Sequence, residues 1–100
     1  MGQPFVHVTY DFGAADRLDA ALAAAHAKVT DLISLRANQR ARLLGAPHSD
    51  DWQGAKRMVF EQEFHAEQGR LSALADEIRR LMSAAAQATD QAHAVNSRAR

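Results

Sequence analysis

Histidines and carboxylates are the residues through which this chain could do chemistry, and one pair has a suggestive spacing. His65 follows Glu61 by four residues, which puts both side chains on one face of a helix. Two such residues can bind a metal ion, but no second pair of ligands accompanies them. A solvated helix face is the better explanation, and we predict no metal site.

The other four histidines are scattered along the chain, at His7, His26, His48 and His93. His26 flanks an apolar stripe beside Leu22 and Val29. A pH-sensitive interface at His26 is therefore an alternative to a purely structural role.

The remaining residue types offer no reactive constellation. The adjacent Asp50 and Asp51 fit helix capping, and Asp76 and Glu77 have the helical spacing of surface ion pairs with Arg80. Cysteine is absent, which excludes disulfides, zinc fingers and thiol nucleophiles. The sequence has neither a nucleophile–base pair nor a glycine-rich loop, and it predicts no enzyme and no cofactor.

Composition points to one small globular domain. The chain has 100 residues, of which 47% are hydrophobic and 24% charged. Twelve basic and twelve acidic residues cancel, so nothing favours nucleic acid or an anionic membrane surface. No apolar run is long enough to span a bilayer. Residues 1–10 have neither the basic region nor the apolar region of a secretory signal peptide.

Two long helices within a single domain, residues 1–100, would position these residues. We predict an extended arm over residues 1–12, a helix over 13–45, a turn over 46–51, a second helix over 52–95 and a frayed tail over 96–100. Asp11 is a candidate cap for the first helix, which Gly45 and Pro47 end. Ser49 and Asp50 are candidate caps for the second.

Apolar residues recur along both helices at alternating spacings of four and three, the pattern of a coiled-coil seam. In the first helix the predicted core positions on this seam are Leu18, Leu22, Val29, Leu32 and Leu43. In the second helix they are Phe60, Phe64, Leu71, Leu74, Ile78 and Leu81. Two such helices joined by a short turn pack antiparallel, so the predicted fold is an all-α helical hairpin.

Three polar residues interrupt the seam. Arg36 and Gln39 lie on the first helix and Glu67 on the second. They predict either a polar contact that fixes the register of the helices or a locally wet stretch of the seam, and the sequence does not choose between the two.

More apolar residues remain than one seam can bury, and they are Ile33, Leu35, Leu44, Met58, Val59 and Met82. Pairing of two hairpins into a four-helix bundle would cover them. A third helix formed by the tail is the alternative. It is disfavoured because Ala84, Ala85 and Ala86 continue the second helix without a break.

The tripeptide Trp52-Gln53-Gly54 contains the single tryptophan and falls near the middle of the chain, beside the predicted turn. Trp52 could bury its ring against a neighbouring helix with its N–H near the open end, and Gly54 could leave room for a close approach. A tryptophan that merely plugs the end of the hairpin is the simpler alternative.

With this placement, the chain resembles the Esx family of small WxG-motif proteins, which type VII secretion systems of actinobacteria export. The resemblance covers nearly the whole chain. Residues 8–12, Val-Thr-Tyr-Asp-Phe, resemble the extended opening, and residues 52–55, Trp-Gln-Gly-Ala, resemble the turn motif. Phe60 follows Trp52 by eight residues, and Leu71, Leu74, Ile78 and Leu81 follow in the expected phase.

The resemblance implies a non-enzymatic protomer that forms a four-helix homodimer or heterodimer with another WxG-type hairpin. It also implies that export depends on the turn motif of one subunit and a C-terminal Tyr-x-x-x-Asp/Glu motif of the other. A secretion ATPase at the membrane would recognise this composite signal through the dimer.

The chain departs from the family at this second motif. Its single tyrosine is Tyr10, and residues 92–96 read Ala-His-Ala-Val-Asn. Trp52 also comes later than is usual. We therefore expect a subunit that is exported with, or chaperones, a partner that supplies the tyrosine motif, with a heterodimer favoured over a homodimer. The alternative is an intracellular helical interaction module with a coincidental W-x-G.

Overall fold

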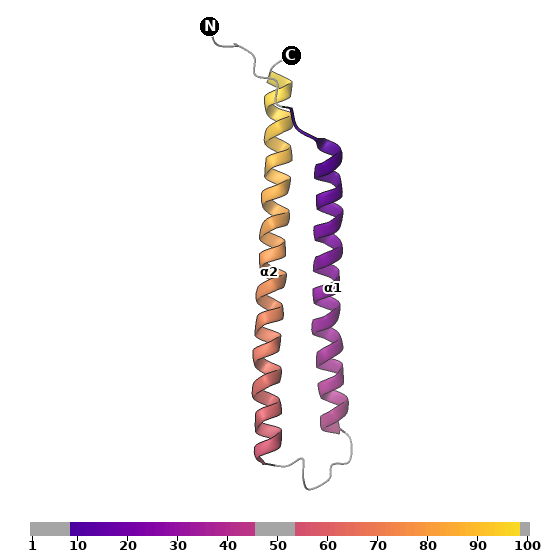
Figure 1. The fold of residues 1–100 in the computed structure, drawn as a ribbon, viewed down its shortest axis with the longest axis vertical. Coiled ribbons are helices and arrows are strands. Elements are labelled where there is room, and N and C mark those ends of the chain that lie inside the picture. The colour runs from indigo at the N-terminus through magenta and orange to yellow at the C-terminus, as the bar shows by residue number, and fades with distance from the viewer. Residues whose placement is uncertain (1–8, 46–53, 99–100) are drawn as a thin grey trace.

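A computed structural model of the chain describes residues 9–45 and 54–98, and both stretches are dominated by helix. Helix α1 spans Phe12–Gly45 and helix α2 spans Ala55–Arg98. The two run antiparallel, side by side along their length (Figure 1). The described residues contain no strand. The predicted all-α class and the helical hairpin are confirmed.

Helix α1 begins where the sequence provides a cap. The Ala14 amide donates a hydrogen bond to Asp11 Oδ1 at 2.8 Å, and the Ala15 amide donates to the Asp11 carbonyl at 3.0 Å. Asp11 is therefore the N-cap, as predicted. Phe12, which was expected to close the extended arm, is already helical. Residues 1–8 of that arm lie outside the described residues.

Helix α2 begins at Ala55, three residues later than predicted. Gly54 has a φ of 69°, in the left-handed region, and its carbonyl accepts the first helical hydrogen bond from the Met58 amide at 3.0 Å. A left-handed residue cannot continue a right-handed helix. The candidate caps Ser49 and Asp50, and the neighbouring Asp51, lie outside the described residues.

The other end of α2 also differs from the expectation. The helix continues to Arg98 instead of ending at residue 95, and residues 96–98, predicted to fray, are helical. The segment just before the start of α1 packs against this end. Tyr10 Oη lies 2.8 Å from Thr89 Oγ1, and the Phe12 ring stacks on His93 with a centroid separation of 4.3 Å.

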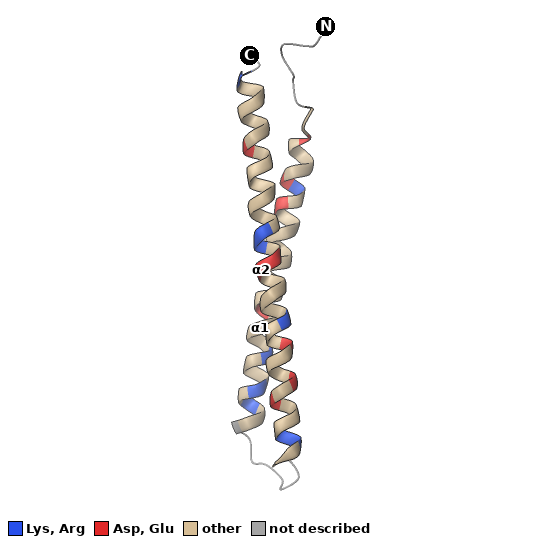
Figure 2. Cartoon of the chain, turned by 90° about the vertical axis from the view of Figure 1, so that its left-hand side faces the viewer, with Lys and Arg blue, Asp and Glu red and all other residues tan. Residues whose placement is uncertain are grey.

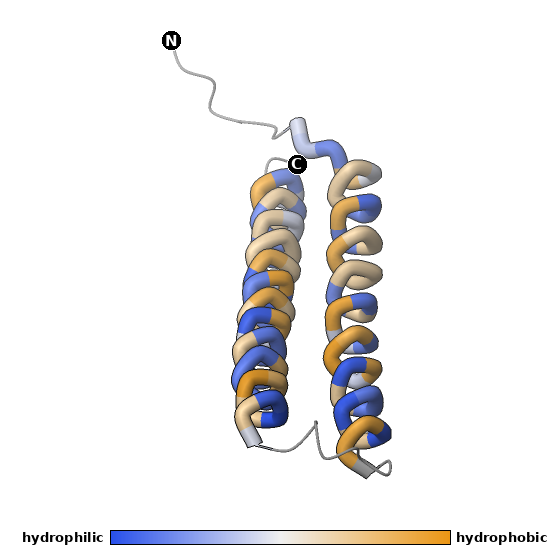
Figure 3. The backbone as a smooth tube through the Cα atoms, turned by 60° about the horizontal axis from the view of Figure 1, so that its bottom comes forward, coloured by the Kyte–Doolittle hydropathy of each residue, from blue (hydrophilic) through white to orange (hydrophobic). Residues whose placement is uncertain are grey.

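The hairpin is long and thin, with principal extents of 80 × 21 × 14 Å. Its radius of gyration is 22.8 Å, whereas a compact 100-residue domain has one of about 13 Å. Only Ala75, Ile78 and Ala92 are buried among the described residues. Figure 3 shows apolar residues recurring along both helices. Because so few described residues are buried, most of these apolar residues remain accessible to solvent. None of the described helices is long and apolar enough to cross a membrane.

Candidate interaction face

The predicted seam divides into two rows when the helices are placed side by side. On α2, Phe64 and Leu71 are half-buried and Ile78 is buried, whereas Leu74 and Leu81 are exposed. A second row of α2 residues also contacts α1, and each of its members follows a position of the exposed row by one residue in the sequence. Its members are half-buried or buried, and they are Gln68, Ala75, Met82 and Thr89.

Helix α1 shows the same displacement. Leu22 and Val29 are half-buried, but Leu18, Leu32 and Leu43 are exposed, and His26 and Ile33 complete the contact with α2. Contact with a single neighbouring helix covers a narrower arc than the apolar stripe occupies. Five of the eleven predicted core residues are therefore outside the interface of the two helices.

Six of the eight large exposed apolar residues, all of them leucines, lie on the same side of the hairpin. Antiparallel helices are related by a twofold axis perpendicular to the plane that holds them. On both helices the exposed row lies one residue before a row that contacts the other helix. The twofold axis therefore turns both exposed rows toward the same side of the hairpin. We call this side the open face, and its large exposed residues are Leu18, Leu32, Leu35, Leu43, Leu74 and Leu81. Their side chains are 37% to 51% exposed, with Leu32 the least and Leu18 the most exposed.

A groove of about 380 Å³ lies on the open face near the turn. Its floor includes Leu43, Phe60 and Phe64, and its polar wall is formed by Arg36, Gln39, Arg40, Glu63 and Glu67. Cations come from α1 and carboxylates from α2. An apolar lining flanked by charged side chains of both signs suits another amphipathic helix better than a small charged substrate.

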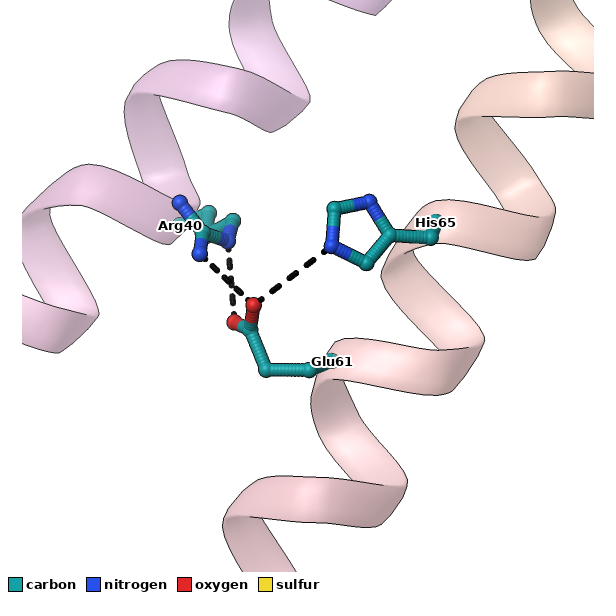
Figure 4. Close-up of polar contacts among 3 residues, drawn as sticks. All are labelled: Arg40, Glu61 and His65. Carbon is teal, nitrogen blue, oxygen red and sulfur yellow. Dashed lines mark hydrogen bonds and ion pairs between the residues drawn. The ribbon is translucent and has the colours of Figure 1, made fainter.

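The strongest polar contact between the helices is at the inner edge of this groove. Arg40 donates from Nε to Glu61 Oε1 at 2.9 Å and from Nη2 to Glu61 Oε2 at 2.6 Å (Figure 4). This hydrogen-bonded pair holds the pKa of the Glu61 carboxyl below its ordinary value and raises the pKa of Arg40, while burial opposes both shifts. The Arg40 guanidinium also lies 5.2 Å from the centre of the Phe64 ring.

The polar residues of the predicted seam are brought together in part. Arg36 Nε lies 2.9 Å from Glu67 Oε1, with the two side chains 49% and 38% exposed. Gln39 is exposed and lines the groove. The Arg36–Glu67 contact is therefore accessible to solvent within the hairpin, so the seam is locally wet at this point. Gln68 adds a hydrogen bond from Nε2 to the Ile33 carbonyl at 3.2 Å.

Of the three residues of the WxG motif, the structure describes only Gly54. Trp52 and Gln53 lie outside the described residues. A Cβ added to Gly54 would meet no atom of the described residues within 4 Å, so the glycine makes room for none of them. Its positive φ is the feature that favours glycine at this position.

Three of the five histidines, His26, His65 and His93, lie within the described residues. His65 Nε2 lies 3.7 Å from Glu61 Oε2, but that carboxylate is already bonded to Arg40. The described residues include no group of three or more metal-ligating side chains. His26 is half-buried at the interface of the helices, and its Nε2 has no hydrogen-bond partner among the described residues.

Sequence reasoning missed the cluster at the open end, where Tyr10 and Phe12 contact Thr89 and His93. The signal was present in the hairpin geometry. Antiparallel helices that meet at a turn near residue 50 bring residues near 10 beside residues near 90. That pairing could have placed the two aromatic side chains on α2.

Comparison with protein-family models, with curated proteins and with solved structures finds no match for this chain.

Proposed function

We propose that this chain is a non-enzymatic pairing subunit whose open face binds a second helical hairpin to complete a four-helix bundle. The observation that carries the proposal is the row of exposed leucines on one side of a hairpin with only three buried residues among those described. Exposed apolar residues gathered on one side of a protein mark an interaction site. Residue spacing on both helices supplies the complementary ridges that helix packing needs.

We further propose that the bundle belongs to type VII secretion. The support is the resemblance of the sequence to the Esx family, with Trp52 and Gly54 at the turn and no tyrosine motif near residues 92–96. In this role the chain is exported with, or chaperones, another WxG-type hairpin that supplies the missing motif. The secretion ATPase then recognises the pair.

Pairing is tested by placing charge on the open face. In Leu32→Glu/Leu74→Glu, both substituted positions are exposed in the hairpin, so helical content should remain. Burying two carboxylates in the bundle should weaken association by at least about 100-fold. Light scattering of the purified chain, alone and with a co-expressed WxG-type hairpin, measures the change. The matched control is Met58→Glu, which is 62% exposed and lies on the side of α2 opposite to Glu63 and Leu74.

Export is tested separately by comparing Trp52→Ala with the unsubstituted chain in culture filtrate and in cells of a host with a type VII system. The proposal expects the secreted amount to fall while the cellular amount is kept. Equal secretion of both would separate the motif from export. Retention of both, with pairing intact, would favour the intracellular interaction module.

A further inference from the structure

Charged residues are unevenly distributed around the hairpin. Positions seven apart lie on one side of a helix with a four-three repeat, so the open face consists of rows that run along both helices. On α1 these are the rows of Leu18, Leu35 and Leu43. On α2 the twofold axis matches them, in this order, with the rows of Leu74, Glu77 and Ile78.

These six rows carry more cations than carboxylates. They contain seven arginines and lysines but only four carboxylates, whereas the other described residues include four arginines and six carboxylates. The neutral composition of the whole chain therefore conceals a cationic open face. Three charged residues fall outside this count, because Asp50, Asp51 and Arg100 lie outside the described residues.

Most of the open-face carboxylates are already engaged within the chain. Glu67 contacts Arg36 at 2.9 Å, and Glu77 contacts Arg80 at 2.9 Å. Asp11 accepts the hydrogen bond that caps α1. Little negative charge on this face therefore remains to neutralise its cations.

The open-face cations are mostly unengaged. Glu63 is the single open-face carboxylate without an ion pair or cap among the described residues. Six cations of the face are exposed and form no ion pair with another described residue, and they are Lys28, Arg42, Lys56, Arg57, Arg70 and Arg98. A partner that covers the leucines brings its own surface close to these cations, where carboxylates stabilise the complex and cations destabilise it.

We propose that the open face recognises an acidic partner, namely an amphipathic helical hairpin whose apolar row is flanked by more carboxylates than cations. The inference rests on the pairing role proposed above and names the chemistry of the partner. A second copy of this chain would place one cationic face against another. An unlike, acidic hairpin is therefore favoured over self-association.

Two cations flank the leucine row near the middle of the hairpin. Ile33 is level with Gln68, as the hydrogen bond between them shows. Lys28 and Arg70 therefore lie on opposite edges of the open face, within about one helical turn of each other in height. A partner meets positive charge on both sides of its apolar row at this level.

A second pair repeats this arrangement closer to the turn. Arg42 follows Lys28 by 14 residues and Lys56 precedes Arg70 by 14 residues. Both steps run toward the turn and correspond to about 20 Å of helix. We therefore expect the partner to present carboxylates on both edges at two heights about 20 Å apart.

The make-up of the face favours a helical partner over an anionic lipid surface or a nucleic acid. A nucleic acid would leave the leucines without an apolar surface to cover them. Glu63 and Glu67 line the groove beside the leucine row. An anionic membrane would repel these carboxylates, whereas a helix can place a cation or an amide against them.

A charge-altered copy of this chain is a suitable acidic probe, because it keeps the leucine row. Lys28→Glu/Arg70→Glu reverses the middle pair and lowers the net charge by four. Both positions lie near mid-length, so they meet Lys28 and Arg70 of the unsubstituted chain whichever way round the probe lies. The unsubstituted chain should bind this variant at least about tenfold more tightly than it binds itself.

Isothermal titration calorimetry measures this difference, which should shrink in about 0.5 M NaCl because salt screens the edge charges. The matched control, Ser34→Glu/Ala41→Glu/Arg79→Glu, also lowers the net charge by four, at exposed positions away from the open face. It should be bound within about twofold of the self-affinity of the unsubstituted chain. Circular dichroism confirms that each variant is helical.

The outcomes separate this inference from the proposed function. Tighter binding of the acidic variant than of the control supports the acidic partner. Equal binding of the two, or binding of a co-expressed WxG-type hairpin but not of the acidic variant, overturns the charge preference and leaves the pairing role standing. Association with phosphatidylglycerol vesicles, but with no hairpin, would assign the face to a lipid surface and overturn both. Absence of association in every mixture also overturns both.

Discussion

The two halves of the hairpin are held together by different means. In the turn half, residues 29–45 and 54–72, the helices are joined by the ion pairs Arg36–Glu67 and Arg40–Glu61. In the terminal half, residues 9–28 and 73–98, no ion pair joins the described parts of the helices. That half instead contains all three buried residues, Ala75, Ile78 and Ala92. Figure 2 shows the same contrast, since the C-terminal third of α2 carries few charged residues.

Side-chain size explains the difference. Small residues occupy covered positions in the terminal half, where Ala25 and Ala85 are half-buried and Ala75 and Ala92 are buried. In the turn half, arginine, glutamate and phenylalanine side chains occupy the space and leave the groove. The comparison indicates that packing stabilises the terminal half, while the turn half keeps an accessible, polar surface.

The largest expected effect comes from removing a buried side chain of the terminal half. Ile78 is 8% exposed, and Ile78→Ala removes most of its buried surface and leaves a cavity. The free energy of unfolding should fall by about 2–4 kcal/mol at a fixed protein concentration, as measured by urea denaturation. Val59→Ala, at a 51% exposed position of the turn half, should change it by less than about 0.5 kcal/mol. Equal losses for the two variants would contradict the division into halves.

The next largest effect is expected from placing a larger side chain at a buried position of the terminal half. Ala92 is 4% exposed, beside the cluster of Tyr10, Phe12, Thr89 and His93. Ala92→Leu should destabilise the chain by about 1–3 kcal/mol, because the close approach of Tyr10 and Phe12 to α2 leaves no volume for the larger side chain. Ala94→Leu, an exposed neighbour on the same helix, is the matched control and should be nearly neutral. A stabilising Ala92→Leu would show that this end is loosely packed.

Ile78 and Ala92 also show how much of the fold could be predicted from the sequence. The periodic leucines predicted both helices and placed Ile78 in the core. The same pattern could not say which residues face α1 and which stay exposed. A four-three repeat is compatible with both contacts, and the rotation of each helix depends on its neighbour. Leu74 and Leu81 therefore belong to the predicted seam and yet are exposed in the hairpin.

The contacts of Tyr10 and Phe12 with Thr89 and His93 could not be predicted from local sequence, for a different reason. An alanine-rich polar segment has no apolar periodicity, so residues 96–100 were predicted to fray. Helix α2 extends to Arg98 while Tyr10 and Phe12 contact it from the far end of the chain, a long-range effect that the tail does not encode. The late start of α2 is local, but it depends on the φ angle of Gly54, which composition does not reveal.

Two glycines of the turn half should respond in opposite directions to the same substitution. Gly54→Ala forces a side chain into the left-handed region and should cost about 1 kcal/mol. Gly69 lies inside α2 with no atom within 4 Å of an added Cβ. Gly69→Ala should therefore stabilise the chain by about 0.5–1 kcal/mol. Thermal and urea unfolding of the two variants measure both changes. The same sign for both would mean that the left-handed turn before α2 does not form in solution.

The smallest effect at neutral pH is expected from the ion pair that distinguishes the turn half, because both side chains remain partly accessible. The contact with Arg40 lowers the folded-state pKa of Glu61, so its contribution is fully present above the unfolded-state pKa and is lost as pH falls through the lower folded-state value. Glu61→Gln should therefore be less stable than the unsubstituted chain at pH 7, and the difference should shrink below about pH 4.5.

Urea midpoints of both chains between pH 3 and 7 give this difference directly. Glu63→Gln, whose carboxylate forms no ion pair with another described residue, is the matched control. It separates the interhelical contact from a general change in net charge. Because the terminal half has no such pair between its described helices, acid should loosen the turn half first. Hydrogen exchange at low pH would then show faster exchange in residues 33–44 and 57–68 than in residues 75–92. Uniform exchange along the hairpin would mean that Arg40–Glu61 does not contribute to holding the turn half together.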